Sequence, residues 1–109
     1  MGPENVKNAK SRLIVALDAP DLNSAEKLLD MLEGQAGVIK VGLELFTACG
    51  PIAVEKVKNR GYEVFLDLKL HDIPNTVAGA VQSALKLNVS MLTVHTGGGR
   101  AMLEAAKES

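Results

Sequence analysis

Cysteine and aromatic residues are scarce in this chain of 109 residues, and neither sign of charge dominates. The only cysteine, Cys49, has no partner for an internal disulfide and no companions for a thiolate zinc site, which suits a reducing cytoplasm. Aromatic residues make up 3% and offer few stacking surfaces for single-stranded nucleic acid. With 12 Lys and Arg residues against 13 Asp and Glu residues, there is no basic excess either. We therefore expect no nucleic-acid partner.

Long hydrophobic runs are also missing, since no apolar stretch approaches the roughly 20 residues that span a bilayer. We therefore expect no membrane partner. Residues 1–11 are polar and lack the apolar centre of a signal peptide, so we interpret them as a flexible lead-in. Hydrophobic residues nevertheless make up 47% of the chain, enough for one small domain over residues 12–109. The expected location is the cytoplasm.

Short apolar runs alternate with helical patterns along the rest of the chain. Strands are expected at 12–17, 38–43, 90–95 and at the start of the segment 63–76. The first of these is nearly all apolar, which is typical of a parallel strand buried on both faces. Helices are expected after each strand, and the residues that suit their ends are Asp21 or Asn23, Gly34, Pro51, Gly61, and Asn75 or Thr76.

This βαβαβαβα order predicts a parallel sheet with right-handed crossovers, in either a doubly wound sheet or part of a (β/α)8 barrel. Polar residues lie in or just after four successive strands: Asp18, Lys40, Asp67, Lys69 and His95. In a barrel the carboxyl ends of the strands converge on one central site, whereas in an open sheet they spread along an edge. We therefore predict a (β/α)8 TIM barrel of which only about the first four βα units are present, because a barrel normally needs about 250 residues.

The segment 63–76 carries the most telling group of charges. Alternate side chains of a strand face opposite sides, so the aliphatic residues at even positions from 64 to 70 share one face. Asp67 and Lys69 lie side by side on the other face, and Asp72 follows where the chain turns away. An ordinary ion pair at a strand end is one interpretation, but we favour a functional site, because strongly coupled charges in a cleft often mark one.

Other polar features are weaker signals. The run Gly97–Gly99 before a helix could bind phosphate, but a plain turn is at least as consistent with its spacing. His71 and His95 are not at metal-ligand spacing, and Cys49 has no catalytic context. Asp67 and Asp72 could hold magnesium, but the charge of Lys69 between them argues against it, and no metal is expected.

Four segments of the chain are similar to the orotidine 5'-phosphate decarboxylase family. They are LIVALDAP at 13–20, IKVGLELF at 39–46, FLDLKLHDIPNT at 65–76 and TVHTGGG at 93–99. The third contains the DxKxxD signature of the family. The resemblance also extends to a magnesium-dependent branch of the same superfamily, the sugar-phosphate decarboxylases, which typically carries glutamate where this chain has Lys40.

The resemblance implies decarboxylation of orotidine 5'-phosphate to UMP in pyrimidine biosynthesis, without cofactor or metal. Lys40, Asp67, Lys69 and Asp72 would form an alternating charge network, with Lys69 as the proton donor. Asp18 and Lys40 would contact the ribose hydroxyls. Asp72, Ile73 and Thr76 would reach the site of a neighbouring subunit, which implies a homodimer with shared sites.

The family's phosphate-binding arginine and closing loop come from its second half, and neither can be located in this sequence. The resemblance therefore implies that this chain alone has little activity. It would be a fragment of a longer protein, one half of a split pair completed by a separate C-terminal half, or a unit that pairs with its own copy. A catalytically silent half-barrel acting as an assembly unit is the alternative of a different class.

Overall fold

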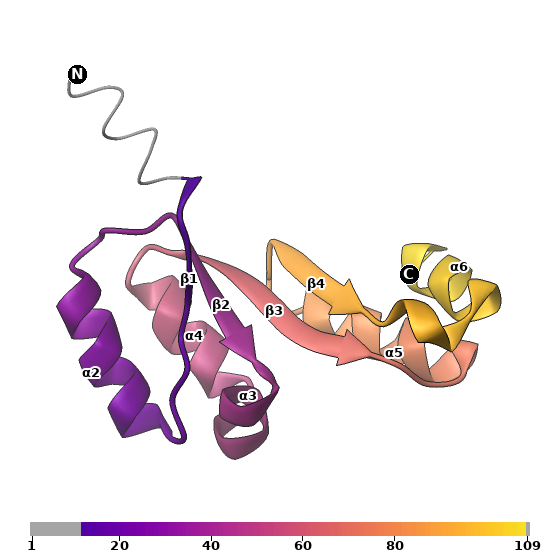
Figure 1. Ribbon diagram of the computed structural model, residues 1–109, viewed down its shortest axis with the longest axis horizontal. Coiled ribbons are helices and arrows are strands. Elements are labelled where there is room, and N and C mark those ends of the chain that lie inside the picture. The colour runs from indigo at the N-terminus through magenta and orange to yellow at the C-terminus, as the bar shows by residue number, and fades with distance from the viewer. Residues whose placement is uncertain (1–11, 109) are drawn as a thin grey trace.

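The computed structural model describes residues 12–108, in which four strands alternate with helices (Figure 1). The expected lead-in at 1–11 lies outside the described residues. The strands are β1 (Ile14–Ala16), β2 (Val38–Gly42), β3 (Glu63–Leu70) and β4 (Met91–Val94). The helices are α2 (Leu22–Leu32), α3 (Leu43–Cys49), α4 (Ile52–Asn59), α5 (Pro74–Leu85) and α6 (Arg100–Glu108), and a 3-10 turn, η1 (Thr96–Gly98), precedes α6.

The strands form one parallel sheet in the order β1-β2-β3-β4, which is also their order in the chain. Every crossover therefore advances in the same direction, and right-handed crossovers then place all helices on one face of the sheet. A doubly wound sheet reverses its order at a switch point and has helices on both faces. The arrangement is that of four consecutive units of a (β/α)8 barrel, as the sequence predicts.

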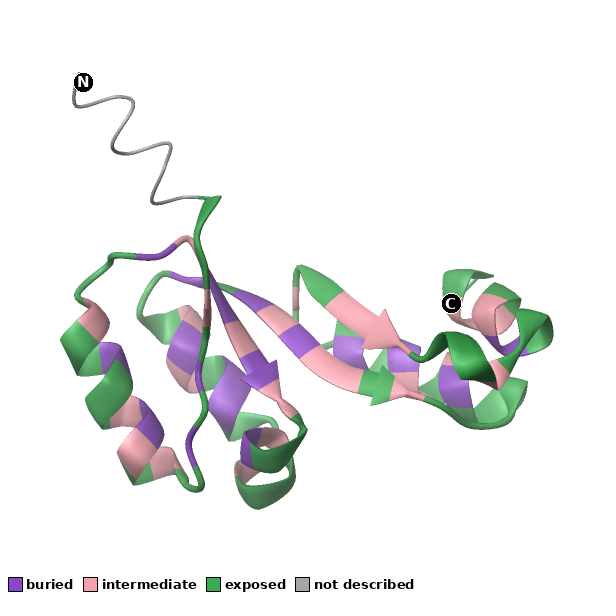
Figure 2. Cartoon of the chain, in the orientation of Figure 1, coloured by how far each residue is buried: buried purple, intermediate pink, exposed green. Residues whose placement is uncertain are grey.

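The main core lies between the sheet and the helices. Alternate residues of β2 and β3 are completely buried there, namely Ile39, Val41, Val64 and Leu66. Their neighbours along each strand face the other side of the sheet and are more exposed, as the banding of β2 and β3 in Figure 2 shows. This second face would line the interior of a barrel, and the charged residues Lys40 and Asp67 lie on it.

A smaller core joins α5 and α6 beside β4, at one side of the molecule (Figure 1). Val77, Val81 and Met102 are its buried members. A Cβ atom at Gly98 would come within 2.0 Å of the Met102 sulfur, so the absence of a side chain there allows Met102 to pack. The radius of gyration, 15.2 Å, exceeds the roughly 13 Å of a compact domain of this length.

Two predictions about the strands need correction. The structure limits β1 to three residues, and Leu13 and Ile14 are about half exposed rather than buried on both faces. The reason is that β1 is an edge strand in the described part of the chain, paired only with β2. The second strand ends at Gly42, and an additional helix that the sequence analysis missed, α3, begins at once with Leu43.

The predictions about helix ends are mixed. Asp21 does cap α2, since its carboxylate accepts a hydrogen bond from the Ser24 backbone N–H at 2.7 Å. Pro51 precedes α4 as expected. The prediction that Asn75 or Thr76 caps α5 is wrong, because Pro74 already occupies the first turn and Ile73 is the N-cap residue. Among the described residues, no helix is both long enough and apolar enough to cross a bilayer.

Candidate active site

Three charged side chains meet on the open face of the sheet. The Lys69 ammonium lies 2.9 Å from each carboxylate oxygen of Asp67 and donates hydrogen bonds to both. The Lys40 ammonium lies 3.8 Å from Asp67 Oδ2 on the other side. The Asp67 side chain is only 11% exposed, whereas those of Lys40 and Lys69 are 34% and 66% exposed. A nearly buried carboxylate thus lies between two lysines, as the sequence predicts for these three residues.

The register of β2 and β3 explains how Lys40 reaches a carboxylate on the next strand. Gly42 is the register partner of Asp67, and Lys40 is the partner of Phe65. Because Gly42 has no side chain, nothing on β2 separates Asp67 from Lys40, which lies two residues earlier on the same face. The long lysine side chain can therefore extend along the strand toward the carboxylate.

The environment of Asp67 lowers the pKa of its carboxyl group. The hydrogen bond from Lys69 is the largest cause, the hydrogen bond from Thr93 comes next, and the charges of Lys69 and Lys40 add to them. Burial acts in the opposite direction and raises the pKa. The carboxylate is therefore ionised at neutral pH, and the cluster of two ammonium groups and one carboxylate carries one net positive charge. Such a site favours an anionic ligand.

A break in the pairing of β3 with β4 shapes this cluster. Leu66 is paired with Leu92, and the next pair is Leu70 with Val94, so three residues of β3 lie opposite one residue of β4, Thr93. Within this bulge Lys69 adopts a φ of +50°, a left-handed conformation that is rare for residues other than glycine. The bulge also explains why Leu68 and Leu70 are only half-buried, although the alternating pattern predicts a buried face.

Thr93 is the site residue that sequence reasoning missed. Its hydroxyl accepts a hydrogen bond from the Lys69 backbone N–H at 2.8 Å and donates one to Asp67 Oδ1 at 2.8 Å. One signal in the sequence could have identified it, because Thr93 is a hydroxyl residue within an otherwise apolar strand. The bulge that brings it against Asp67 cannot be inferred from that pattern.

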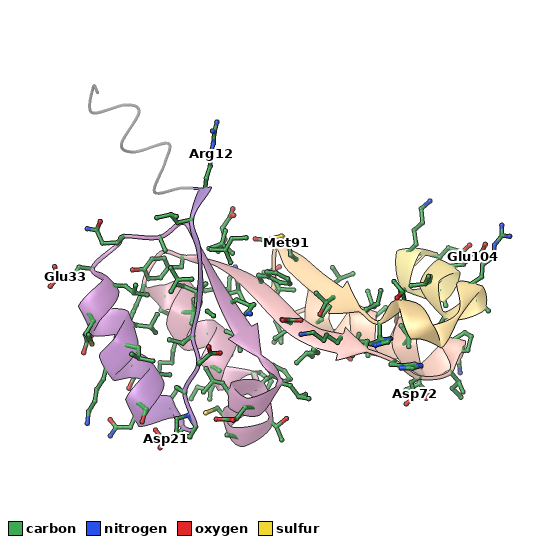
Figure 3. All side chains as sticks on the ribbon, viewed as in Figure 1. Arg12, Asp21, Glu33, Asp72, Met91 and Glu104 are labelled. Atoms are coloured by element: carbon green, nitrogen blue, oxygen red, sulfur yellow. The ribbon has the colours of Figure 1, made fainter. Side chains whose placement is uncertain are left out.

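Asp72 does not join the cluster in this structure. Its carboxylate accepts a hydrogen bond from the adjacent Ile73 backbone N–H at 2.7 Å, and no ion pair within residues 12–108 includes it. The residue lies beyond the end of β3, at the entry to α5 (Figure 3). Asp72, Ile73 and Thr76 are all exposed, and Ile73 is 65% exposed despite its apolar side chain. Of the four residues predicted to form an alternating charge network, only Lys40, Asp67 and Lys69 are joined in this structure.

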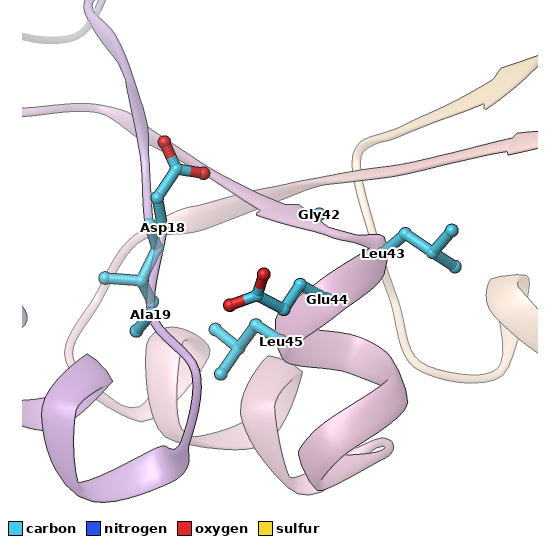
Figure 4. Close-up of a pocket in the computed structure, with 7 residues that line it drawn as sticks. Asp18, Ala19, Gly42, Leu43, Glu44 and Leu45 are labelled. Carbon is cyan, nitrogen blue, oxygen red and sulfur yellow. The ribbon is translucent and has the colours of Figure 1, made fainter.

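Asp18 lies at the rim of a separate hollow between the ends of β1 and β2 (Figure 4). The hollow is lined by 17–19 and 42–45, and the Glu44 side chain extends across it toward the segment that carries Asp18 and Ala19. In the described part of the chain, no ion pair links Asp18 to Lys40. Asp18 and Lys40, which are predicted to contact the ribose, therefore lie on neighbouring strands without an ion pair between them.

The glycine run after β4 forms a closed turn. The Gly97 N–H donates to His95 Nδ1 at 2.9 Å, and the Gly98 and Gly99 N–H groups donate to backbone carbonyls at 3.2 and 3.4 Å. Because all three groups have internal partners, the plain turn is favoured over a phosphate cradle. The His95 ring also stacks on His71 with ring centres 4.8 Å apart. Across residues 12–108, no three His, Cys, Asp or Glu side chains gather in a way that could hold a metal.

Comparison with known sequences shows which proteins this chain is similar to. An orotidine 5'-phosphate decarboxylase of Moorella thermoacetica is 62% identical over 99 residues, which are 91% of this chain and 39% of that protein. One from Teredinibacter turnerae is 52% identical over 98 residues, covering 90% of this chain and 42% of the relative. The chain thus spans about two fifths of the length of these relatives.

Solved structures give the same relationship. A crystal structure of orotidine 5'-phosphate decarboxylase from Lactobacillus acidophilus aligns with a TM-score of 0.77 at 40% identity, over 88% of this chain and 43% of that one. The enzyme from Pyrococcus horikoshii aligns with a TM-score of 0.79 at 32% identity, over 88% and 47%. A sequence model described as the orotidine 5'-phosphate decarboxylase / HUMPS family matches residues 11–109, and the chain belongs to this family.

Proposed function

We propose that this chain supplies the charged part of the active site of an orotidine 5'-phosphate decarboxylase. The observation that carries the proposal is the cluster in which Lys69 and Lys40 flank the nearly buried carboxylate of Asp67. The cluster lies toward the carboxyl ends of parallel strands, where barrel enzymes hold their substrates. Relatives that carry this name are 52% and 62% identical over nearly all of the chain.

The reaction that we propose needs no cofactor or metal. The bond between C6 of the pyrimidine and its carboxylate breaks, CO2 leaves, and the electron pair remains on C6. The Lys69 ammonium stabilises the developing negative charge and then transfers a proton to C6, which gives UMP. A fixed ammonium beside a developing carbanion stabilises it without the reorganisation that solvent requires.

Asp67 has two effects in this proposal. Its carboxylate holds the Lys69 ammonium at 2.9 Å, and it would also lie against the carboxylate of the substrate. Two like charges at close range disfavour the bound ground state, and this repulsion disappears as CO2 leaves. The lowered pKa of Asp67 keeps the repelling charge in place at neutral pH.

Contacts to the rest of the substrate and to a second subunit belong to the same proposal. Asp18 and Lys40 would bind the ribose hydroxyls, and Asp72 would complete the charge network when substrate and a partner subunit are bound. The exposed residues Ile73 and Thr76 would enter the site of that partner in a homodimer. The phosphate would be bound by groups outside these 109 residues, so we expect the chain alone to be inactive.

The test joins this chain to the remaining C-terminal part of the Moorella thermoacetica relative and measures loss of orotidine 5'-phosphate spectroscopically. We expect decarboxylation by the fusion, none by the 109-residue chain, and loss of at least a thousandfold in kcat for Lys69→Ala, since this removes both the proton donor and the main charge. Lys86→Ala, at an exposed lysine that follows α5, is the matched control and should retain full activity. A folded fusion that leaves the substrate unchanged would reject the proposal.

The magnesium-dependent sugar-phosphate decarboxylases remain the second candidate. The matching family model is broader than orotidine 5'-phosphate decarboxylase alone, so the match by itself does not separate the two candidates. Lys40 argues against it, because an ammonium 3.8 Å from Asp67 occupies the surroundings that a cation would need. Activity of the fusion that survives exhaustive chelation would exclude this candidate, whereas activity on a sugar phosphate that chelation abolishes would support it.

A further inference from the structure

The unusual feature of the site is how one hydroxyl serves two partners. Within the bulge, Asp67 and Lys69 lie on β3 opposite the single residue Thr93 of β4. In a regular parallel ladder, the N–H of Lys69 would pair with a backbone carbonyl of the neighbouring strand. Here the Thr93 hydroxyl oxygen accepts that hydrogen bond at 2.8 Å.

The Thr93 hydroxyl has a single hydrogen to donate, and the surrounding contacts determine the direction in which this hydrogen points. Because the oxygen already accepts from the Lys69 N–H, its own hydrogen points to Asp67 Oδ1 at 2.8 Å. Asp67 Oδ1 thus accepts hydrogen bonds from the Thr93 hydroxyl and the Lys69 ammonium. Oδ2 accepts a second hydrogen bond from Lys69 and forms the ion pair with Lys40. Rotation of the carboxylate would break several of these contacts at once, so its orientation is well defined.

We propose that Thr93 is a positioning residue that holds the Asp67 carboxylate and the backbone of Lys69 in one fixed relation. The inference rests on the proposed function, since it assigns Thr93 to the geometry of that same site. The hydroxyl stabilises the left-handed conformation of Lys69, whose φ is +50°, and thereby directs the ammonium back onto Asp67. Without it, the bulge would relax and the ammonium and carboxylate would separate.

The first arm of the test uses the 109-residue chain and requires no activity. Thr93→Val keeps the shape and β-branching of threonine but removes both hydrogen bonds. We expect the pKa of Asp67, followed by carbon NMR of its carboxyl group, to rise in Thr93→Val and to return toward the parent value in Thr93→Ser. An Asp67 titration that is the same in all three proteins would overturn the inference. Thr47→Val, an exposed threonine of α3, is the control.

The second arm measures decarboxylation by the fusion described above. Misplacement of a reacting group by about 1 Å can cost roughly a hundredfold in rate, so we expect kcat to fall tenfold to a hundredfold in Thr93→Val with a smaller change in KM. Thr93→Ser should recover most of the loss, and Thr47→Val should match the parent. Full activity of Thr93→Val, or equal loss in Thr93→Val and Thr93→Ser, would overturn the inference. If the parent fusion were inactive, the proposed function would fail, while the titration would still decide the role of Thr93.

Discussion

Lys69 combines a strained backbone with the ammonium on which the proposed chemistry depends, and two substitutions separate these properties. Lys69→Ala and Lys69→Gly both remove the ammonium, but only glycine adopts a φ of +50° without steric cost. A residue with a Cβ pays roughly 1–2 kcal/mol in the left-handed region. Glycine loses about 0.5–1 kcal/mol more backbone entropy than alanine on folding. The side chain is 66% exposed, so the lost methyl group adds little.

Subtracting the entropy term from the steric term makes Lys69→Gly more stable than Lys69→Ala by about 0.75 kcal/mol, between extremes of about 0 and 1.5 kcal/mol. Urea unfolding followed by circular dichroism measures the difference directly, and a thermal scan should show a gap of roughly 2 to 8 °C. Asn88, with a φ of +56°, provides the matched pair outside the site. Asn88→Gly should likewise be more stable than Asn88→Ala, with activity of the fusion unchanged in both.

A different order of stability would contradict this reasoning. If Lys69→Ala were more stable than Lys69→Gly by about 0.5–1 kcal/mol, only the entropy difference would remain, and the left-handed conformation of Lys69 would carry no strain. Activity gives a separate result, because both Lys69 variants should be inactive in the fusion. Recovery of activity in Lys69→Gly would show that the backbone rather than the ammonium matters.

Two further predictions concern the smaller core and the acid dependence of stability. Met102 lies on α6 and is fully buried in the smaller core, so Met102→Ala should lower the free energy of unfolding by about 2–4 kcal/mol in urea titrations. Met31 is 78% exposed, and Met31→Ala should change the free energy of unfolding by less than about 0.5 kcal/mol. A loss in Met102→Ala no larger than that in Met31→Ala would show that this core contributes little. The pKa of Asp67 is lowered in the folded state, so its stabilising contribution is complete above the unfolded value of about 3.9 and is lost as the pH falls through the lower folded value. The difference in unfolding free energy between the parent and Asp67→Asn should therefore be largest near pH 6 and should shrink below about pH 4; a difference independent of pH would contradict the lowered pKa.

Local patterns were sufficient for most of the fold. The four apolar runs became the four strands because short runs rich in Val, Ile and Leu between turn residues favour strands in any such chain. The alternation of Val64 and Leu66 with Asp67 predicted which face of β3 would be buried. The failures lie where tertiary context decides. β1 is exposed because it is an edge strand, which its own composition cannot reveal. The start of α5 was missed for another reason: Pro74 is well suited to the first helical position, and this local signal was overlooked in favour of Asn75 and Thr76 as caps.

The sequence by itself determined the alternating strands and helices, the family, and the place of Asp67 and Lys69 on one face of their strand, because side chains alternate along a strand. The approach of Lys40 to Asp67 was implied by the family resemblance and depends on the register of β2 with β3. Only the tertiary structure decided that Asp72 stays outside the cluster and that Thr93 enters it. Asp72 lies in the turn beyond β3, where its carboxylate accepts a hydrogen bond from the Ile73 N–H, and the contact of Thr93 depends on the register shift between β3 and β4, where three residues lie opposite one. A register is set by the packing of whole strands against their neighbours, and no single strand carries that information.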